Sequence, residues 1–525
     1  MATQAWVLKD DKLYAAGFSG ETELAATSES IVRLLADKPG EIVLFDFKEL
    51  LKRFPELLAV EAEKILDVKL AAYVCDPADN LDNVKSCIER FMPEAAVNSH
   101  ADEAEILLKI GEMLREKIAG NDIYNKLELP LVPVLAAMEK TGISVNGAEL
   151  EKFGERLAGE LADCEKTIFE LAGKTFNINS TKQLSELLFE TLQLPPVGKK
   201  TKSAYSTDAE TLEKLTDQHP IVPQILKYRK LSKIKSTYVE GLLKYIQKDG
   251  KVHTSFNMTA TATGRLSSVE PNMQNIPVAG DLGGEIRKFI HPDSGMIFID
   301  ADYSQIELRV LAHMANDPVM IAAFQNNQDI HTTTASQIFG VDAKAVTPEM
   351  RRKAKAVNFG IVYGISAFTL GNDLKTAKAE AQEYINKYFE KYSAVKNYLD
   401  NAIKKAKDNG YAETLFGRKR FLSELKSKNF AVRAFGERVA LNMPIQGTAA
   451  DLIKMAMVKV SDQLKKECPA AEILLQVHDE LLISAPEDQA GKAEKILREA
   501  MQNVCNLSVP LEVSIATGKN YFEVK

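Results

Sequence analysis

The chain has 525 residues, of which 45% are hydrophobic and 26% charged, the composition of an ordinary folded globular protein. One hydrophobic core rarely serves so long a chain, so we expect several domains. No apolar run approaches the roughly 18 residues of a membrane span, and charged residues follow the start too soon for a signal peptide. Five scattered cysteines in no metal-binding or redox spacing are typical of reduced thiols in a cytoplasmic protein.

The acidic residues are concentrated toward the N-terminus. The net charge is −7, yet residues 1–110 hold 12 Lys and Arg against 21 Asp and Glu, a local charge of −9. Taking these from the totals of 66 and 73 leaves 54 basic and 52 acidic residues, a charge of +2 for the remainder. The larger part of the chain is therefore near neutral, and its basic residues remain available to line a groove for nucleic acid.

In chain order, the first 105 residues alternate short apolar runs with helical patterns. Residues 41–45 predict a buried strand and residues 48–58 an amphipathic helix, and the apolar run 70–74 precedes a turn. Together these features predict a compact α/β domain.

Helical patterns then continue to residue 250. Between residues 103 and 175 we expect interruptions at Pro130, Pro133 and Gly142. Residues 176–250 continue as helices around a polar insert at 198–203, which is typical of a basic loop. Such a loop is compatible both with simple solvent exposure and with direct DNA contact.

Strand patterns appear after residue 250. Residues 251–256 and 296–300 predict strands on either side of a loop rich in Gly, Asn and Pro. Helical periodicity returns from residue 305 to 407. Two apolar runs, 473–477 and 481–484, flank the polar triplet at 478–480 and predict a hairpin.

Two acidic residues stand where predicted strands end, Asp302 after residues 296–300 and Asp479 at the hairpin tip. Either one alone is typical of a turn. Together they suggest phosphoryl transfer, which needs charge placed where oxygens become anionic. Two Mg²⁺ ions about 4 Å apart can serve that purpose, and Mg²⁺ is usually held by a few carboxylates with phosphates and water. The hypothesis requires the fold to bring Asp302 and Asp479 together.

Residues 351–364 form the sharpest pattern. Every fourth residue is cationic or aromatic, and on an α-helix the four share one face; they are Arg351, Lys355, Phe359 and Tyr363. The cationic end suits a triphosphate and the aromatic end suits a base or sugar. An amphipathic helix with a solvated basic start would show the same spacing. His331 is a further phosphate candidate, although a lone histidine is often structural.

With these segments together, the chain resembles the family A DNA polymerases, the bacterial DNA polymerase I group. The resemblance extends over nearly the whole chain and is greatest to the large fragment of that enzyme. Residues 302–309 (DYSQIELR) resemble motif A, residues 351–364 motif B, and residues 476–480 (QVHDE) motif C. Further matching runs lie at 263–268, 272–277 and 442–451.

The resemblance implies a multidomain α/β protein with a right-hand fold. The palm would carry an antiparallel sheet, the fingers and thumb would be helical, and an N-terminal α/β domain of the ribonuclease H-like exonuclease type would precede them. The implied domains are an exonuclease-like domain at 1–110, connecting helices and thumb at 111–255, a first palm segment at 256–312, fingers at 313–430 and a second palm segment at 431–525.

The resemblance also implies roles for individual residues. Metal ligands would be Asp302, Asp479 and the carbonyl of Tyr303, with Glu480 nearby and Lys355 completing the catalytic set. The incoming dNTP would contact Gln305, Ile306, Glu307, His331, Arg351, Lys355, Phe359 and Tyr363. Glu307 would be a steric gate that rejects ribonucleotides by clash at the 2′ position.

Contacts to DNA follow in the same way. Arg265, Gln446 and His478 would read the minor groove at the primer end, where the acceptors are nearly independent of sequence. Further DNA contacts would come from Gln274, Asn275, Arg438 and Asn442, and from the thumb residues Asn177, Asn179, Lys182, Lys233, Ser236 and Thr237. The implied partners are a primer–template duplex and dNTPs. The implied cofactor is a pair of Mg²⁺ ions, for which Mn²⁺ could substitute. The resemblance also implies a monomer that acts in the bacterial cytoplasm at the nucleoid and has no membrane partner.

The sequence departs from the family pattern at the N-terminus. Residues 1–110 contain no Asp-x-Glu pair, residues 45–50 are an altered second exonuclease motif, and Asp102 follows Asn98 where the family has Tyr. We therefore expect a folded relic without 3′→5′ exonuclease activity. The family's 5′ nuclease is expected to be absent, in either a truncated or a natural short form.

Two other functions compete with a DNA polymerase. A single-subunit RNA polymerase shares the two-aspartate palm, but a bulky acid at Glu307 favours deoxynucleotides. A non-catalytic module that binds primer–template is suggested by the relic domain, but such a module should have lost some of the charged ligands, and all of them are present here.

Overall fold

A computed structural model describes residues 3–9, 11–17, 22–36, 40–79, 81–197, 205–277 and 281–525. Two compact units make up the chain: unit 1 comprises Met1–Thr141, Ser255–Val269 and Gly295–Thr517, and unit 2 comprises Gly142–Thr254, Glu270–Ser294 and Gly518–Lys525. Among the described residues, no helix is both long enough and apolar enough to cross a bilayer. The basic insert at 198–203 lies outside the described residues.

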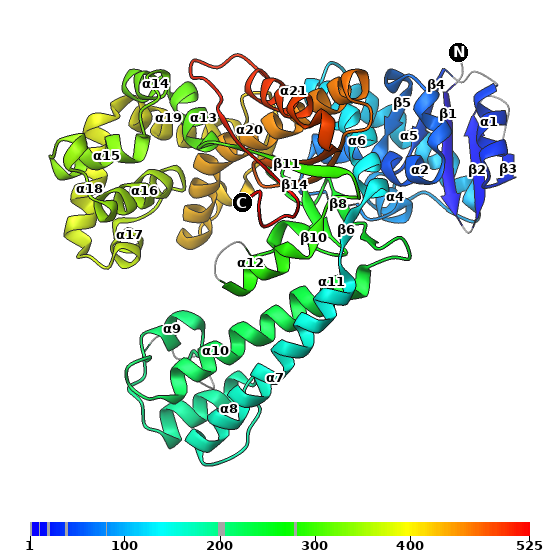
Figure 1. Cartoon of the computed structure of the whole chain (residues 1–525). Coiled ribbons are helices and arrows are strands. Elements are labelled where there is room, and N and C mark those ends of the chain that lie inside the picture. The colour runs from blue at the N-terminus through cyan, green and yellow to red at the C-terminus, as the bar shows by residue number, and fades with distance from the viewer. Residues whose placement is uncertain are drawn as a thin grey trace. The chain divides into compact units, whose positions relative to one another are not determined.

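Unit 1 begins with a five-stranded mixed sheet in the order β3-β2-β1-β4-β5 (Figure 1). Its strands are β1 (Thr3–Lys9), β2 (Lys12–Gly17), β3 (Thr22–Ala25), β4 (Glu41–Leu44) and β5 (Ile65–Asp67). The helices of this part are α1 (Ser28–Ala36), α2 (Phe47–Arg53), α3 (Val68–Cys75), α4 (Val84–Phe91) and α5 (His100–Ile118). The strand predicted at 41–45 is confirmed as β4. We call residues 3–118 the N-terminal region.

The helical prediction for residues 103–175 is confirmed, but the expected proline breaks are wrong. A π-helix, η3 (Ile123–Glu128), runs directly into α6 (Leu129–Thr141), which contains both prolines. Pro130 follows directly on the wider π-turn of η3, whose hydrogen bonds continue to the Leu129 N–H, so the helical run passes through it without a break. Pro133 removes one backbone hydrogen bond, but buried Leu131, Val132 and Leu135 hold the helix by packing.

The predicted C-terminal hairpin is confirmed and belongs to the four-stranded sheet β14-β15-β11-β16. The strands are β11 (Met296–Tyr303), β14 (Glu472–Val477), β15 (Glu480–Pro486) and β16 (Val513–Gly518). Both β14 and β15 are apolar and buried almost throughout. Beside this sheet run α20 (Phe430–Glu467) and α21 (Ala490–Gln502). A separate two-stranded hairpin, β8 (Ser255–Asn257) and β9 (Ser267–Val269), lies in the same unit.

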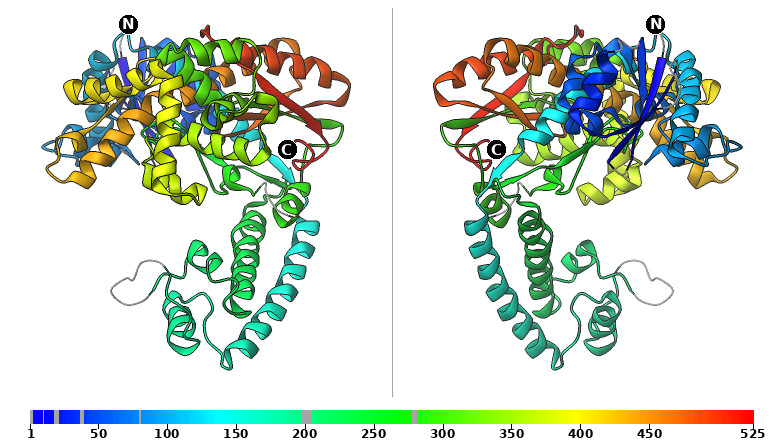
Figure 2. Two further views of the ribbon diagram at one scale, coloured as in Figure 1. Left: turned by 90° about the vertical axis from the view of Figure 1, so that its left-hand side faces the viewer. Right: turned by 90° about the vertical axis from the view of Figure 1, so that its right-hand side faces the viewer.

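Helices fill residues 305–409 of unit 1, as the periodicity predicts (Figure 2). They are α13 (Ile306–Ala315), α14 (Pro318–Gln325), α15 (Ile330–Phe339), α16 (Pro348–Val362), α17 (Ala367–Leu374), α18 (Lys378–Lys391) and α19 (Ser393–Asn409). The hairpin β12 (Tyr411–Glu413) and β13 (Lys419–Phe421) follows. Buried Thr334 bridges α15 to its neighbours, because its hydroxyl meets Asn358 Oδ1 at 3.0 Å and the Tyr392 hydroxyl at 3.2 Å.

Unit 2 is mostly helical, and α7 (Gly147–Ala172) packs lengthwise against α10 (Ile221–Lys233) (Figure 2). Its other elements are α8 (Thr181–Ser185), α9 (Ala209–Glu213), α11 (Glu240–Tyr245), α12 (Asp281–Lys288), and the π-helices η4 (Glu186–Thr191) and η5 (Ile234–Val239). A short sheet joins β10 (Ile290–His291), β6 (Ile143–Val145) and β7 (Lys251–Val252). The strand predicted at 251–256 is therefore split, because β7 belongs to unit 2 and β8 to unit 1.

Candidate active site

Strand pairing brings Asp302 and Asp479 to one end of the four-stranded sheet. In the antiparallel register of β11 and β15, Asp302 lies opposite Glu480, the residue after Asp479. The Tyr303 N–H donates to the Asp479 carbonyl oxygen at 3.1 Å. His478 occupies the left-handed region (φ 55) in the turn between β14 and β15, which closes the hairpin tightly. The fold thus meets the spatial requirement that the sequence left open.

The electrostatics of this pair favour a bound cation. Partial burial, and then the negative charge of Asp302, raise the pKa of Asp479 to about 6. Two carboxylates that repel each other in a partly desolvated site are the arrangement that a divalent cation relieves. In the part of the chain that the structure describes, no group of three or more His, Cys, Asp or Glu side chains forms a ready-made metal cage. A cation here would draw on two carboxylates, backbone carbonyl oxygen, water and substrate phosphate.

Glu307 is held rigidly beside these acids. Gln305 takes the left-handed region (φ 57) and starts α13, so that Ile306 and Glu307 follow one turn after β11. The Glu307 side chain is buried, and its two oxygens accept from Arg265 Nη2 at 2.7 Å and from the Tyr363 hydroxyl at 2.9 Å. Burial and the Glu307 charge raise the pKa of Tyr363 to about 12, so the phenol stays a donor at neutral pH.

The face of α16 predicted from the four-residue spacing is present. Lys355 Nζ lies 6.0 Å from the Phe359 ring centre, and the His331 and Phe359 rings lie 5.8 Å apart. Arg351 Nε donates to Asp329 Oδ2 at 2.6 Å. This end of the site therefore gathers two cations, an imidazole and a ring within one pair of packed helices, α15 and α16.

His331 is a neutral donor in this cluster. Burial, which outweighs the effects of the neighbouring charges, lowers the pKa of His331 to about 4. Asn358 Nδ2 lies 2.9 Å from His331 Nδ1 and donates to it, which places the ring proton on Nε2. At neutral pH the imidazole can donate a hydrogen bond to a phosphate oxygen but adds no charge.

The residues expected to contact DNA fall in both units. In unit 1, Arg265 lies in the β8–β9 hairpin, His478 is exposed at the β14–β15 turn, and α20 carries Arg438, Asn442 and Gln446 along one stretch of helix. In unit 2, Gln274 and Asn275 lie in a short 3₁₀ helix. The thumb candidates all have exposed side chains; they are Asn177, Asn179, Lys182, Lys233, Ser236 and Thr237.

Two residues that position this site were not singled out in the sequence. Asp329 caps α15 and pairs with Arg351, and its place two residues before His331 at a helix start was an available signal. Asn358 fixes the His331 tautomer, but it is fully buried and lies three residues after Lys355, off the face defined by the four-residue spacing. No pattern in the sequence pointed to it.

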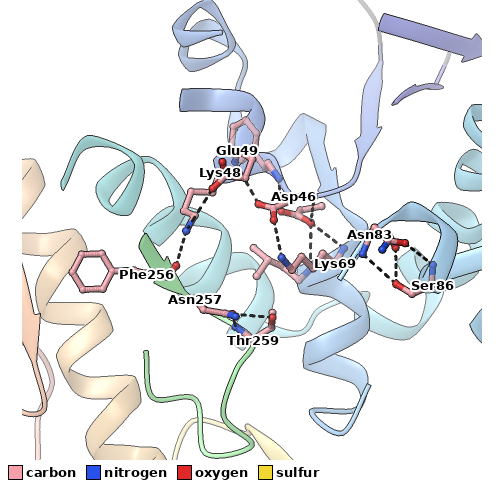
Figure 3. Close-up of polar contacts among 12 residues, drawn as sticks. Asp46, Lys48, Glu49, Lys69, Asn83, Ser86, Phe256, Asn257 and Thr259 are labelled. Carbon is pink, nitrogen blue, oxygen red and sulfur yellow. Dashed lines mark hydrogen bonds and ion pairs between the residues drawn. The ribbon is translucent and has the colours of Figure 1, made fainter. Parts of the chain in front are cut away.

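The acids expected in the exonuclease relic are held by protein groups. Figure 3 shows Asp46, in the left-handed region at the start of α2, accepting from Lys69 Nζ at 2.7 Å. Asp102 accepts from the backbone N–H groups of Asn98 at 2.7 Å and Ser99 at 2.9 Å, which lowers its pKa. Both carboxylates thus serve as helix caps or ion-pair partners in this structure.

Comparisons with known proteins agree with the motifs. The model of DNA polymerase family A matches residues 147–523. DNA polymerase I of Caldicellulosiruptor bescii is 49% identical in an alignment that covers 87% of this chain and 55% of that protein. DNA polymerase I of Geobacillus stearothermophilus is 44% identical in an alignment that covers 96% of this chain and 60% of that protein. The chain thus spans somewhat more than half the length of these curated relatives.

The fold also matches that of a solved polymerase structure. The POL domain of Pol1 from M. smegmatis, in complex with DNA primer-template and dNTP, is 35% identical and superposes with a TM-score of 0.92. The match covers 100% of this chain and 96% of that chain. It confirms the polymerase fold expected from the motifs. Because the family model, the relatives and the M. smegmatis structure all agree, the chain belongs to DNA polymerase family A.

Proposed function

We propose that the protein carries out template-directed, primer-dependent DNA synthesis, as in DNA replication and repair, through attack of the primer 3′-OH on the α-phosphate of a dNTP with release of pyrophosphate. The observation that carries this proposal is the strand register that sets Asp302 beside Asp479 in a family A fold. Its action at the nucleoid in the cytoplasm stays a prediction.

The residues present fit a divalent cation site. Asp302, Asp479 and the Tyr303 carbonyl would hold the ions, with Glu480 opposite Asp302 in the sheet. Two Mg²⁺ ions, or Mn²⁺ in their place, would supply activation of the attacking hydroxyl and neutralisation of the leaving oxygen. The protein's part is to hold both carboxylates on one rigid sheet end, which lowers the cost of ordering them when substrate binds.

The helices α15 and α16 would bind the dNTP. Arg351 and Lys355 would contact the triphosphate as cations, and neutral His331 would donate one hydrogen bond to it. Phe359 would pack against the sugar and base. Because Arg351 is paired with Asp329, the triphosphate would have to share or displace that carboxylate.

Glu307 would set the choice of sugar. Its carboxylate is fixed by Arg265 and Tyr363, so it cannot easily swing away from a 2′-OH. A buried and immobilised acid rejects a ribonucleotide by steric clash, whereas a mobile one would yield. The hydrogen bond from Arg265 to Glu307 also links the proposed reader of the primer end to the residue proposed to select the sugar.

We further propose that the N-terminal region has no 3′→5′ exonuclease activity. Support comes from the missing Asp-x-Glu pair and from the protein partners that hold Asp46 and Asp102. Without a full ligand set, two ions cannot be bound there.

A primer-extension assay tests these proposals together. With Mg²⁺, a labelled primer on a template should be extended with dNTPs but not with rNTPs, and a mismatched 3′ nucleotide should never be excised. Extension with rNTPs would refute the role of Glu307, and excision would refute the loss of the exonuclease. DNA binding without any extension would favour a non-catalytic module.

A further inference from the structure

The β8–β9 hairpin of unit 1 is anchored to the N-terminal region by a buried lysine. Lys48 of α2 is 7% exposed, and its ammonium donates to the Phe256 carbonyl oxygen at 2.5 Å and to Glu139 Oε1 at 2.6 Å (Figure 3). The Phe256 N–H donates to the same Glu139 oxygen at 2.7 Å. Both backbone polar groups of Phe256 are thus held by one buried ion pair, at the edge of β8 away from β9.

A buried tyrosine makes the second anchor. Tyr73 of α3 is 0% exposed, and its hydroxyl donates to the Thr261 carbonyl oxygen at 2.7 Å. Thr261 in turn shapes the hairpin, because its hydroxyl donates to the Arg265 carbonyl oxygen at 2.9 Å and its carbonyl accepts from the Gly264 N–H at 3.4 Å. Tyr73 therefore fixes the residue around which the tip of this hairpin folds.

From this tip a chain of hydrogen bonds reaches the proposed sugar gate. Arg265 donates to Glu307 at 2.7 Å, and Tyr363 donates to the other Glu307 oxygen at 2.9 Å. Beside the Lys48 anchor the hairpin borders a cavity of about 210 Å³ whose lining includes Lys69, Asn257 and Thr259. Because packing is incomplete beside β8, the hydrogen bonds made by Lys48 and Tyr73 contribute more to holding the hairpin in place.

We propose that Lys48 and Tyr73 are positioning residues for the polymerase reaction. By hydrogen-bonding Phe256 and Thr261, they fix the position of the β8–β9 hairpin. The hairpin in turn places Arg265 at the primer end and against Glu307. The N-terminal region thereby acts on the accuracy of synthesis rather than on excision. This inference rests on the proposed function of Arg265, and both anchors act from within the protein interior, where their side chains are buried.

Tyr73→Phe is the sharpest test, because it removes one hydroxyl and keeps the ring. We expect single-nucleotide addition to a matched primer end to fall about three- to tenfold, tenfold being 1.4 kcal/mol at 25 °C. Extension of a mismatched end should fall less, since it already lacks a correctly placed minor-groove acceptor for Arg265. The ratio of matched to mismatched extension therefore decreases.

Tyr124→Phe is the matched control. Tyr124 is also buried in unit 1, and its hydroxyl accepts the Asp67 N–H at 2.8 Å, so the substitution removes a buried hydrogen bond that is not made to the hairpin. This variant should lower Tm about as much as Tyr73→Phe while leaving the discrimination ratio at its wild-type value. An equal change of the ratio in both variants, or no change in Tyr73→Phe, would overturn the proposal.

Lys48→Met and Lys52→Met give an independent pair. Both lysines are on α2 and both pair with Glu139, but of the two it is Lys48 that hydrogen-bonds Phe256. We expect Lys48→Met to lower discrimination and Lys52→Met to leave it unchanged.

A double-mutant cycle separates this inference from the proposed function. If Tyr73 acts through Arg265, Tyr73→Phe should add nothing to the loss of discrimination in Arg265→Ala. Additive losses would overturn the positioning role while leaving Arg265 as a primer contact. Wild-type discrimination in Arg265→Ala would instead refute the proposed role of Arg265, and the inference with it.

Discussion

Replacing Asp479 with Asn should stabilise the metal-free protein at pH 8. Its pKa is raised from 3.8 to about 6 by burial and by Asp302. Because folding raises this pKa, the contribution of the Asp479 carboxyl to the free energy of unfolding is fully present below pH 3.8 and is lost as the pH rises through 6. At 1.36 kcal/mol per pKa unit the shift corresponds to roughly 3 kcal/mol, an upper bound for a site that is not fully buried. The neutral amide of the Asp479→Asn variant would carry no charge to be desolvated and would not be repelled by the Asp302 carboxylate.

Thermal unfolding in EDTA measures this effect. We expect Asp479→Asn to raise Tm by a few degrees at pH 8, for a stabilisation of about 1 to 3 kcal/mol, and to raise it about half as much at pH 5, where this carboxyl is ionised in the unfolded chain but still protonated in the folded one. Added Mg²⁺ should raise the Tm of the wild type and not of the variant. The control Asp488→Asn, at an exposed position, should have the Tm of the wild type at both pH values and should be stabilised by Mg²⁺ as the wild type is. A variant that is less stable than the wild type at pH 8 would refute the account of two repelling acids.

Three further predictions follow from the site and its surroundings. Glu307→Ala should raise rNTP incorporation relative to dNTP by about tenfold or more, measured by competitive single-nucleotide addition, since the clash with the 2′-OH is lost. NMR titration of His331 should show no protonation between pH 5.5 and 8, because its pKa is lowered to about 4 by burial; a midpoint near 6.5 would contradict its packing against Asn358. Arg418→Met should lower unfolding free energy in urea by about 3 to 5 kcal/mol, because it leaves buried Glu128 and Asp451 short of a cation; exposed Lys426→Met should change little.

The local elements of the fold could be predicted from the sequence. The hairpin of β14 and β15 was evident because two apolar runs flank a polar triplet, and α16 was evident because its charges and rings recur every fourth residue. The proline breaks in α6 were mispredicted because tertiary packing outweighs the loss of one backbone hydrogen bond. The resemblance, rather than any local pattern, indicated that Asp302 and Asp479 meet.

What the sequence did not reveal were contacts between residues far apart along the chain. Lys48 meets the Phe256 carbonyl across 208 positions, and Arg418 meets Glu128 across 290. In the sequence each is an ordinary charged residue, and only the fold shows that it is buried against its partner. The division into two units was hidden for the same reason, since the chain leaves unit 1 after Thr141 and returns to it twice.

We propose that Asp302 and Asp479 act together in nucleotide addition. Single-turnover primer extension by Asp302→Ala and Asp479→Ala, with the Kd for primer–template measured alongside, tests it most directly. We predict that each variant loses extension by several orders of magnitude while its Kd for DNA changes little. Substantial extension by either variant would contradict the claim, however closely the two residues lie in the fold.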